Sequence, residues 1–430
     1  MLLRAAAATA TVAAVPTLER QLRLLRGFGL LTYPFACVPF LFLWFQSHGL
    51  DAAGYGEVLS TYYLAMLLAE VPTGMLADRF GQKGMLVLGP GVLAAGFATL
   101  LLWPTRPGFL IGEALLGCGH AVLSGPPTVM LYESLCAHGQ EARYLAEEAR
   151  VNARRMLGTG CSFALGGLFA HLGDPDHTAY GLTIAVTCGL ELLAAGIALR
   201  TIAAPRASSL RARHLLRHVG GELRKPAVAW LCAYWVVLFA LLRFPFHNYQ
   251  PYLSATAALE PWFGQPLLVG SLFTVLNLFA APLSSLLPRL VARHGRLWLF
   301  WLMPLVLAGS LLVMAGERLA AAAGQGSVLL AWCGVCMFFV QQVPFGMHQS
   351  LLNEFVNHRL GATARTTVLS TLSLLARLAY AGLNLLLFRL QARHGLGPAL
   401  GLAGLVGAVA TCLVMWARPR GTLRGSDPIG

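Results

Sequence analysis

Apolar stretches that each run for about twenty residues recur along this chain, and they constrain its fold more than any other feature. A helix of that length crosses the ~30 Å hydrocarbon core of a bilayer. The stretches are continuous rather than alternating, which argues against a membrane β-barrel. Only 11% of the 430 residues are charged, against about 25% in soluble domains. Because backbone polar groups must be paired inside lipid, the sequence predicts an all-α membrane protein.

The stretches predict twelve transmembrane helices in two groups of six. A basic cytoplasmic linker over 201–226 separates an N-terminal six-helix bundle, 24–200, from a C-terminal one, 227–417, with tails at 1–23 and 418–430. The predicted helices cover 24–47, 54–77, 84–103, 108–136, 148–171, 180–200, 227–252, 266–288, 297–315, 326–347, 364–388 and 397–417.

The positive charge lies on one side of this topology. With the N-terminus inside, 25 of the 31 Lys and Arg fall in or beside inside segments, four fall on the outside, and Arg243 and Arg377 fall within helices. This bias follows the positive-inside rule and predicts that both termini are cytoplasmic, in a cell inner membrane. It also explains the formal net charge of +13 without a nucleic-acid partner.

A short polar hairpin between the second and third predicted helices carries the most specific pattern. Residues 74–83 read GMLADRFGQK, and a degenerate copy, LVARHGR, follows the eighth helix at 290–296. At an offset of 214 residues, Leu, Arg and Gly match and the Asp is missing. The first copy resembles the signature loop of the major facilitator superfamily, whose two six-helix bundles are related by pseudo-symmetry.

The resemblance implies a membrane transporter that alternates between inward- and outward-open states, with this hairpin as its conformational switch. In the family the carboxylate at the position of Asp78 faces the N-terminal end of helix 11 when the cytoplasmic side is shut, where a helix dipole favours negative charge. The residues assigned to the switch are Gly74, Asp78, Arg79, Gly81 and Lys83.

Further segments resemble one bacterial, efflux-like branch of the superfamily, namely 70–74, 131–135 and 364–370. Two departures argue against a proton/drug antiporter of the usual kind. Glu113 stands where the family often has a helix-4 Arg, and the helix-5 antiporter motif is reduced to Gly166-Gly167.

Ionisable residues within the predicted helices are candidates for function, since such a residue costs ~2.5–3.5 kcal/mol on insertion scales. Two mid-span arginines favour an anionic substrate, because guanidinium binds carboxylate and phosphate through two parallel bonds; pairing with an acidic residue is the alternative. The candidate substrate-binding residues are Arg243, His247, Asn277, Gln341 and Arg377, and the candidate proton-coupling residues are Glu70, Glu113 and His120. His120 also fits a hydrogen-bonded core histidine, and Glu191 has no role in this scheme.

The motifs of several other function classes are missing. The sequence has no phosphate-binding P-loop, no H-E-x-x-H zinc motif and no G-x-S-x-G nucleophile turn, and its C-x-x-C at 333–336 lies on an apolar helix. We therefore expect no cofactor, no metal and no enzyme activity, and a monomer in the bilayer.

Taken together, the sequence predicts a proton-coupled secondary transporter of a small solute, with export the expected direction. An uptake permease for an organic anion is the first alternative. A non-transporting sensor or a membrane-embedded enzyme on the same scaffold is the second.

Overall fold

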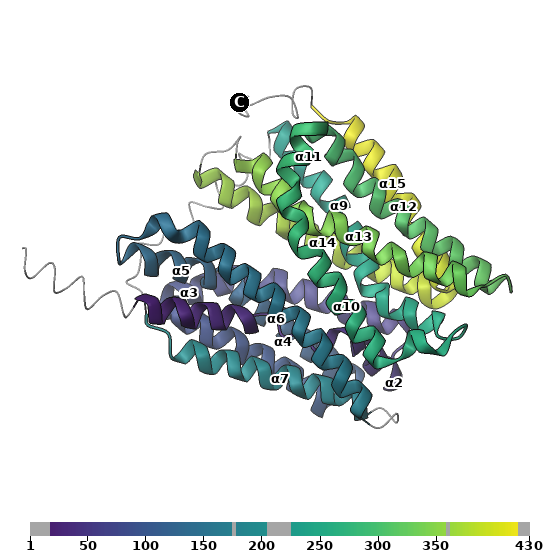
Figure 1. The fold of residues 1–430 in the computed structure, drawn as a ribbon, viewed down its shortest axis with the longest axis horizontal. Coiled ribbons are helices and arrows are strands. Elements are labelled where there is room, and N and C mark those ends of the chain that lie inside the picture. The colour runs from purple at the N-terminus through teal and green to yellow at the C-terminus, as the bar shows by residue number, and fades with distance from the viewer. Residues whose placement is uncertain (1–17, 174–177, 204–224, 358–361, 420–430) are drawn as a thin grey trace, which may run out of the picture. The chain divides into compact units, whose positions relative to one another are not determined.

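The computed structural model describes residues 18–173, 178–203, 225–357 and 362–419, and within these ranges the chain is helical and contains no strand. Two compact units divide it. In the described ranges, the first unit consists of the residues up to Leu41 and those from Ala65 to 203. The second unit consists of Phe42–Leu64 and the residues from 225 onward. Figure 1 shows the helices of each unit with their labels.

The first unit begins with a helix over 18–31 that is followed by a break at 32–37. Its further helices are η1 (Val38–Phe40), the later part of α3 (Ala52–Leu102), α4 (Arg106–Leu123), α5 (Pro126–Cys136), η2 (Glu141–Arg143), α6 (Tyr144–Leu172) and α7 (Thr178–Leu199). Two small-residue contacts bring α6 against the first helix and the break. A Cβ on Gly158 would lie 1.8 Å from the Leu30 carbonyl oxygen, and one on Gly166 would lie 2.0 Å from that of Ala36, so only glycine permits this approach.

The second unit holds α2 (Leu41–Ser47) from Phe42 onward and the first thirteen residues of α3, together with the helices after the gap. These are α9 (Pro226–Thr256), η3 (Pro261–Gly264), α10 (Pro266–Ala280), η4 (Ala281–Leu286), α11 (Leu287–His294), α12 (Arg296–Ala322), α13 (Val328–Asn357), α14 (Ala362–His394) and α15 (Leu396–Trp416). Helices α12 and α15 lie side by side, and α9 packs against both α14 and α15 (Figure 1).

Prolines explain where the predicted helices are interrupted. The predicted helix 24–47 is broken around Pro34, and 108–136 divides into α4 and α5 just before Pro126. The predicted helix 266–288 passes through the 3₁₀ segment η4, which contains Pro282. Proline lacks the amide hydrogen that a continuing helix needs, and its ring clashes with the preceding turn. The helix over 24–47 is therefore interrupted, whereas 108–136 and 266–288 each still fall within one membrane-length stretch, Arg106–Cys136 and Pro266–His294.

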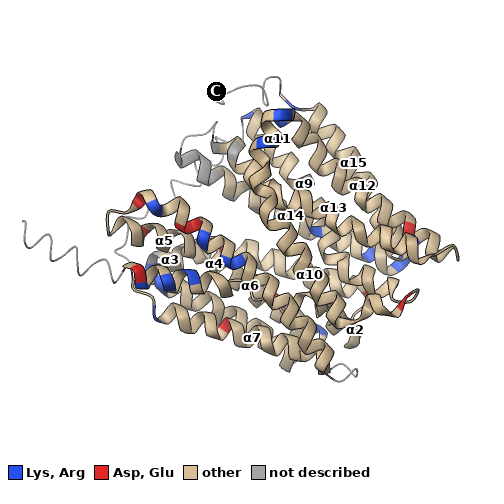
Figure 2. Ribbon diagram, viewed as in Figure 1, with Lys and Arg blue, Asp and Glu red and all other residues tan. Residues whose placement is uncertain are grey.

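Nine helical stretches in the described ranges are long and apolar enough to cross a membrane. The predicted spans 24–47, 54–77 and 148–171 also fall on helix but not among those nine. The helix over 24–47 is interrupted, and the beginning of 148–171 carries charged residues. Figure 2 shows that most of the helical ribbon carries no charged residue. The fold class is therefore confirmed, while the number of spanning helices stays a prediction.

Two hairpins contain a glycine in the same backbone conformation. Gly81 interrupts α3 with φ 71° and ψ 170°, and Gly295 separates α11 from α12 with φ 79° and ψ 161°. This region of backbone space is open essentially to glycine alone. The two glycines are the matching positions of the degenerate sequence repeat, so the repeat extends to backbone conformation.

Substituting Gly81 by alanine is expected to destabilise its hairpin by on the order of 1–3 kcal/mol, because a Cβ is strained at that φ and ψ. Gly74→Ala is the matched control, since Gly74 is helical and a Cβ there meets no described atom within 4 Å. Thermal unfolding in detergent measures both variants. Equal stability of the two would contradict the backbone argument.

A buried carboxylate joins three arginines in the first unit. Glu147 has 0% of its surface exposed and accepts hydrogen bonds from Arg26 at 2.9 and 2.6 Å, Arg143 at 3.2 Å and Arg150 at 2.5 Å. Burial is the largest single influence and raises the pKa of Glu147, but the hydrogen bond and charge of Arg26, aided by Arg150, outweigh it and hold the pKa below its usual value. We name Glu147 and these three arginines the Glu147 network.

A second buried ion pair lies near the end of α12. Glu317 and Arg318 are adjacent residues, exposed by 4% and 8%, and Arg318 donates to both carboxylate oxygens of Glu317. The Tyr252 hydroxyl of α9 donates to Glu317 at 2.6 Å, and the Arg318 guanidinium lies 5.0 Å from the Tyr252 ring. Arg318, predicted to lie in an outside loop, is therefore helical and paired.

Candidate functional site

Arg243 is the centre of the candidate site in the second unit. It lies in the middle of α9, half-buried, with its guanidinium carbon 5.4 Å from the centre of the Phe239 ring. Within the described part of the chain it makes no hydrogen bond and no ion pair. An arginine in a membrane-spanning helix usually pairs with an acid or faces a polar ligand. For Arg243, the pairing alternative raised by the sequence therefore has no support among the described residues.

His247 lies one turn beyond Arg243 and is held by two tyrosines. Its Nε2 atom is 3.0 Å from the Tyr63 hydroxyl, and its ring stacks on Tyr380 with centroids 6.2 Å apart and an interplanar angle of 22°. Tyr63 and Tyr380 meet edge to face at 5.0 Å. Tyr63 comes from α3 and Tyr380 from α14, so three helices of the second unit position one imidazole.

A second histidine approaches the same arginine from α13. The His348 ring stacks on Trp235 at 5.5 Å and 18°, and its Nδ1 atom is 2.7 Å from the Phe345 carbonyl oxygen. The positive charge of Arg243 acts on both His247 and His348. An unpaired guanidinium, two imidazoles and a wall of aromatic rings can bind an anion that carries an apolar or aromatic body. We name the set the Arg243 cluster: Arg243, His247, His348, Tyr63, Tyr380, Phe239 and Trp235.

The other predicted substrate residues lie outside these contacts. Gln341 is buried on α13 and donates from its Nε2 to the Ser310 hydroxyl of α12 at 2.8 Å. That bond joins two helices, as a packing residue would. Asn277 is half-buried on α10, and Arg377 is half-buried on α14, one turn before Tyr380. None of the contacts that build the Arg243 cluster involves these three residues.

Of the predicted proton-coupling residues, Glu113 is the most buried. It lies in α4, exposed by 3%, without a hydrogen bond or ion pair to any described residue. His120 is exposed by 7%; its Nδ1 atom is 2.9 Å from the Leu116 carbonyl oxygen and its ring stacks on Tyr33 at 5.6 Å. Those are the contacts of a packed core histidine. Glu70 is half-buried on α3.

The predicted switch residues surround the break in α3. Arg79 is exposed, with its guanidinium carbon 5.6 Å from the Phe80 ring, and Lys83 is half-buried beyond the break at Gly81. Gly74 is exposed in the preceding helix. The side chain of Asp78 lies outside the described residues, and so do the side chains at the start of the predicted helix 364–388, which the resemblance makes its partner.

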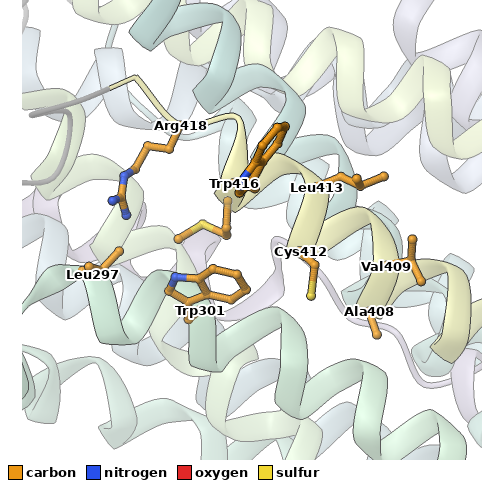
Figure 3. A pocket seen from close by; sticks show the side chains of 9 residues that line it. Leu297, Trp301, Ala408, Val409, Cys412, Leu413, Trp416 and Arg418 are labelled. Atoms are coloured by element: carbon orange, nitrogen blue, oxygen red, sulfur yellow. The ribbon is translucent and has the colours of Figure 1, made fainter.

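An open groove of about 780 Å³ lies in the second unit between α12 and α15. Figure 3 shows two indole rings, Trp301 and Trp416, among its lining side chains, with Arg418 at its edge. None of the predicted site residues lines it. Its apolar lining and outward position suit contact with lipid more than selective binding of a polar solute.

The comparison with protein families decides the identity. The family model described as Major Facilitator Superfamily matches residues 24–381. The chain belongs to the Major Facilitator Superfamily. It is a multi-pass membrane protein with the fold of a secondary transporter, and family and fold are those of transporters rather than of enzymes.

Solved transporters share this fold across nearly the whole chain. The nucleoside transporter NupG covers 95% of this chain and 99% of its own at a TM-score of 0.74 and 14% identity. The D-xylose-proton symporter covers 97% and 99% at 0.69 and 12% identity. Identities this low establish the fold and nothing about the solute.

Curated relatives match shorter stretches. The inner membrane transport protein YajR of Escherichia coli (strain K12) is 35% identical over 71 residues, 16% of each chain. The 4-hydroxybenzoate transporter PcaK of Pseudomonas putida is 34% identical over 89 residues, 20% of each chain. The match thus spans a fifth or less of the length of these relatives.

Tyr63, Tyr380 and His348 were not found from the sequence. Aromatic residues in an apolar run look the same whether they pack a core or line a site, and no spacing rule links residue 63 to 247 or 380. His348 lies one residue beyond the predicted span 326–347, and the structure extends this helix to Asn357.

Tyr63→Phe is expected to weaken solute binding by roughly 3- to 10-fold, because it removes a hydrogen bond worth about 0.5–1.5 kcal/mol from His247. Tyr62→Phe, the same change at the neighbouring position, is the control. Equilibrium binding to the purified protein measures both. An equal effect of the two changes would show that the hydroxyl of Tyr63 does not position His247.

Proposed function

We propose that this protein is a proton-coupled secondary transporter of a small organic anion, with a carboxylate bound by Arg243. The observation that carries the proposal is a guanidinium in the middle of a membrane helix without a hydrogen bond or ion pair in the described chain. An arginine in a membrane-spanning helix without a counter-ion is costly. A transported carboxylate would supply the missing charge and two parallel hydrogen bonds.

The rings around Arg243 support an aromatic or partly apolar anion. Phe239, Tyr63 and Tyr380 contact one another at ring-centre distances of 5.0 to 6.2 Å. Offset and edge-to-face ring contacts are favourable in this range. PcaK is named for transport of 4-hydroxybenzoate, a ring with a carboxylate, which makes this compound the first probe.

Proton coupling and orientation complete the proposal. Glu113, Glu70 and His120 are the candidate proton carriers. The distribution of Lys and Arg supports an inner-membrane location with both termini in the cytoplasm. The name of YajR, an inner membrane transport protein, agrees with that location. We propose that the monomer is the working unit.

The test is transport in proteoliposomes with an imposed pH gradient and an internal pH dye. Radiolabelled 4-hydroxybenzoate is expected to accumulate with proton movement, while 4-hydroxybenzamide, which keeps the ring and lacks the charge, is not. Accumulation of the amide to the same level would contradict the proposal that the solute is recognised as an anion. Accumulation of neither compound across a panel of carboxylates, with the protein correctly inserted, would contradict the proposed substrate class.

Export of a small solute is the second candidate, and the efflux-like segments at 70–74 and 364–370 favour it. The same vesicles distinguish the two directions. Reversing the pH gradient in vesicles with one protein orientation changes whether the solute is accumulated or expelled. An uptake permease accumulates the anion when protons flow toward the cytoplasmic face, and an exporter expels it.

A further inference from the structure

Glu191 is an ionisable residue that the proposed site does not use. It lies in the middle of α7 in the first unit, with 0% of its surface exposed. Neither carboxyl oxygen has a hydrogen-bond partner among the described residues, and no described Lys, Arg or His pairs with it. Full burial also excludes contact with a second copy of the chain.

Among the described residues, the surroundings of Glu191 contain thiols and hydroxyls but no positive charge. The carboxyl lies near the thiols of Cys188, on the same helix, and Cys37, in the break after the first helix; Glu113 also lies near Cys37. The Thr187 hydroxyl is already engaged by the Cys37 amide at 3.1 Å and the Thr183 carbonyl oxygen at 2.8 Å.

The elements that pack against α7 are the possible sources of a countercharge for Glu191. Helix 18–31 contacts α7 where Gly27 approaches Ile197. Helix α3 contacts α7 where the Cys188 thiol donates to the Ala94 carbonyl oxygen. Helix α6 also packs against α7. The titratable groups near Glu191 are Cys188 on α7 itself, Cys37 in the break after the first helix and, beyond Cys37, Glu113 on α4. All three are neutral or negative.

An ionised carboxylate in such a place is unfavourable, because an isolated buried charge loses its hydration without gaining a partner. The group neutralises instead by holding a proton. A neutral glutamic acid without a hydrogen bond packs no better than a leucine of similar size would. Leucine follows at the next two positions of α7, Leu192 and Leu193. Retaining a carboxyl here therefore points to a use for its proton.

We propose that Glu191 is a proton-binding site of the first unit, separate from Glu70, Glu113 and His120. It holds one proton in the resting protein and releases it in the transport cycle; only a proton moves, so no other reactant is needed. This inference rests on the proton coupling of the proposed function, whereas the protonation of Glu191 can be measured without any solute.

Infrared difference spectroscopy of the full-length protein in lipid tests the protonation. Subtracting the spectrum of Glu191→Gln from that of the wild type at neutral pH is expected to leave a carboxylic-acid carbonyl band that shifts in D₂O. Glu317→Gln, the matched control at a buried but paired carboxylate, is expected to leave carboxylate bands. Carboxylate bands for Glu191, or an acid band that does not shift in D₂O, would overturn the proposal.

A second measurement avoids substitution altogether. Dicyclohexylcarbodiimide adds to protonated carboxyl groups in apolar surroundings and leaves a stable acylurea that peptide mass spectrometry locates. Glu191 of the wild type is expected to be modified, and less so as pH rises, while Glu317 stays unmodified. A Glu191 that stays unmodified at every pH would overturn the proposal.

Transport separates this inference from the proposed function. Gradient-driven accumulation depends on proton coupling, whereas solute counterflow does not need net proton movement. For Glu191→Gln, the ratio of the first rate to the second is expected to fall at least about tenfold, within the usual range of coupling between sites. An unchanged ratio would overturn the role of Glu191 in coupling. If the wild type itself moves no protons with solute, the proposed function fails, and the infrared result still decides whether Glu191 binds a proton.

Discussion

Arg243→Ala is expected to weaken the binding of 4-hydroxybenzoate by roughly 100-fold or more and to stop its accumulation in proteoliposomes. Removing one partner of a buried, hydrogen-bonded charge pair costs about 2–5 kcal/mol, and about 1.4 kcal/mol corresponds to a tenfold change in affinity. The loss is large because Arg243 has no ion-pair partner among the described residues, so its whole charge is available to the bound carboxylate.

The control is Arg389→Ala in the same unit. Arg389 is half exposed, and its guanidinium lies 3.8 Å from Glu57, so its removal changes the net charge equally and is expected to leave binding within about twofold. Arg243→Lys keeps the charge without the planar fork and is expected to fall between the two. Binding isotherms at one ionic strength measure all three variants. Arg243→Ala with wild-type affinity would remove this residue from the solute site.

Glu147→Gln is expected to destabilise the first unit by on the order of 2–4 kcal/mol at neutral pH, because it leaves three arginines around an uncharged side chain. For a unit of this size that lowers the midpoint of thermal unfolding by roughly 5 °C or more. Glu19→Gln is the matched control. Glu19 bonds the same Arg143 but is 43% exposed, so its loss is expected to cost less than about 1 kcal/mol.

The pH dependence of the same variant gives a second check. Because the folded-state pKa of Glu147 lies below its usual value, its contribution to stability is present above the unfolded-state pKa of about 4.3. It is lost as pH falls through the lower folded-state pKa. Unfolding midpoints of wild type and Glu147→Gln are therefore expected to converge in acid. A constant difference at every pH would show that the effect is one of packing rather than of charge.

Hydropathy and charge predicted the fold class because lipid leaves the backbone few alternatives. The repeated motif at 74–83 and 290–296 located Gly81 and Gly295 as matching positions, and the shared backbone conformation of these glycines gives that repeat a physical cause. The interruption near Pro34 was missed because a proline in a membrane helix can kink it or end it, and the local sequence does not decide between these outcomes.

The candidate site was only partly predictable. Arg243 and His247 stand out as ionisable residues in apolar runs, and the structure places them beside each other. Their aromatic neighbours come from positions 63, 239 and 380, and only packing in three dimensions brings these together. Glu191 had no explanation at all, because the sequence shows that a carboxyl lies in a membrane helix and does not show whether a cation lies beside it.

The adjacent pairing of Glu317 with Arg318 bears on how the protein is made. Both charges lie on one helix in consecutive positions, so each is neutralised without help from any other segment. Helix α12 can then leave the translocon for lipid as soon as it is synthesised, with no need to wait for later helices. Arg243 lies between Leu242 and Phe244, without an adjacent acidic residue. Helix α9 therefore enters the membrane with an unneutralised charge, which remains until the other helices of the unit pack around it.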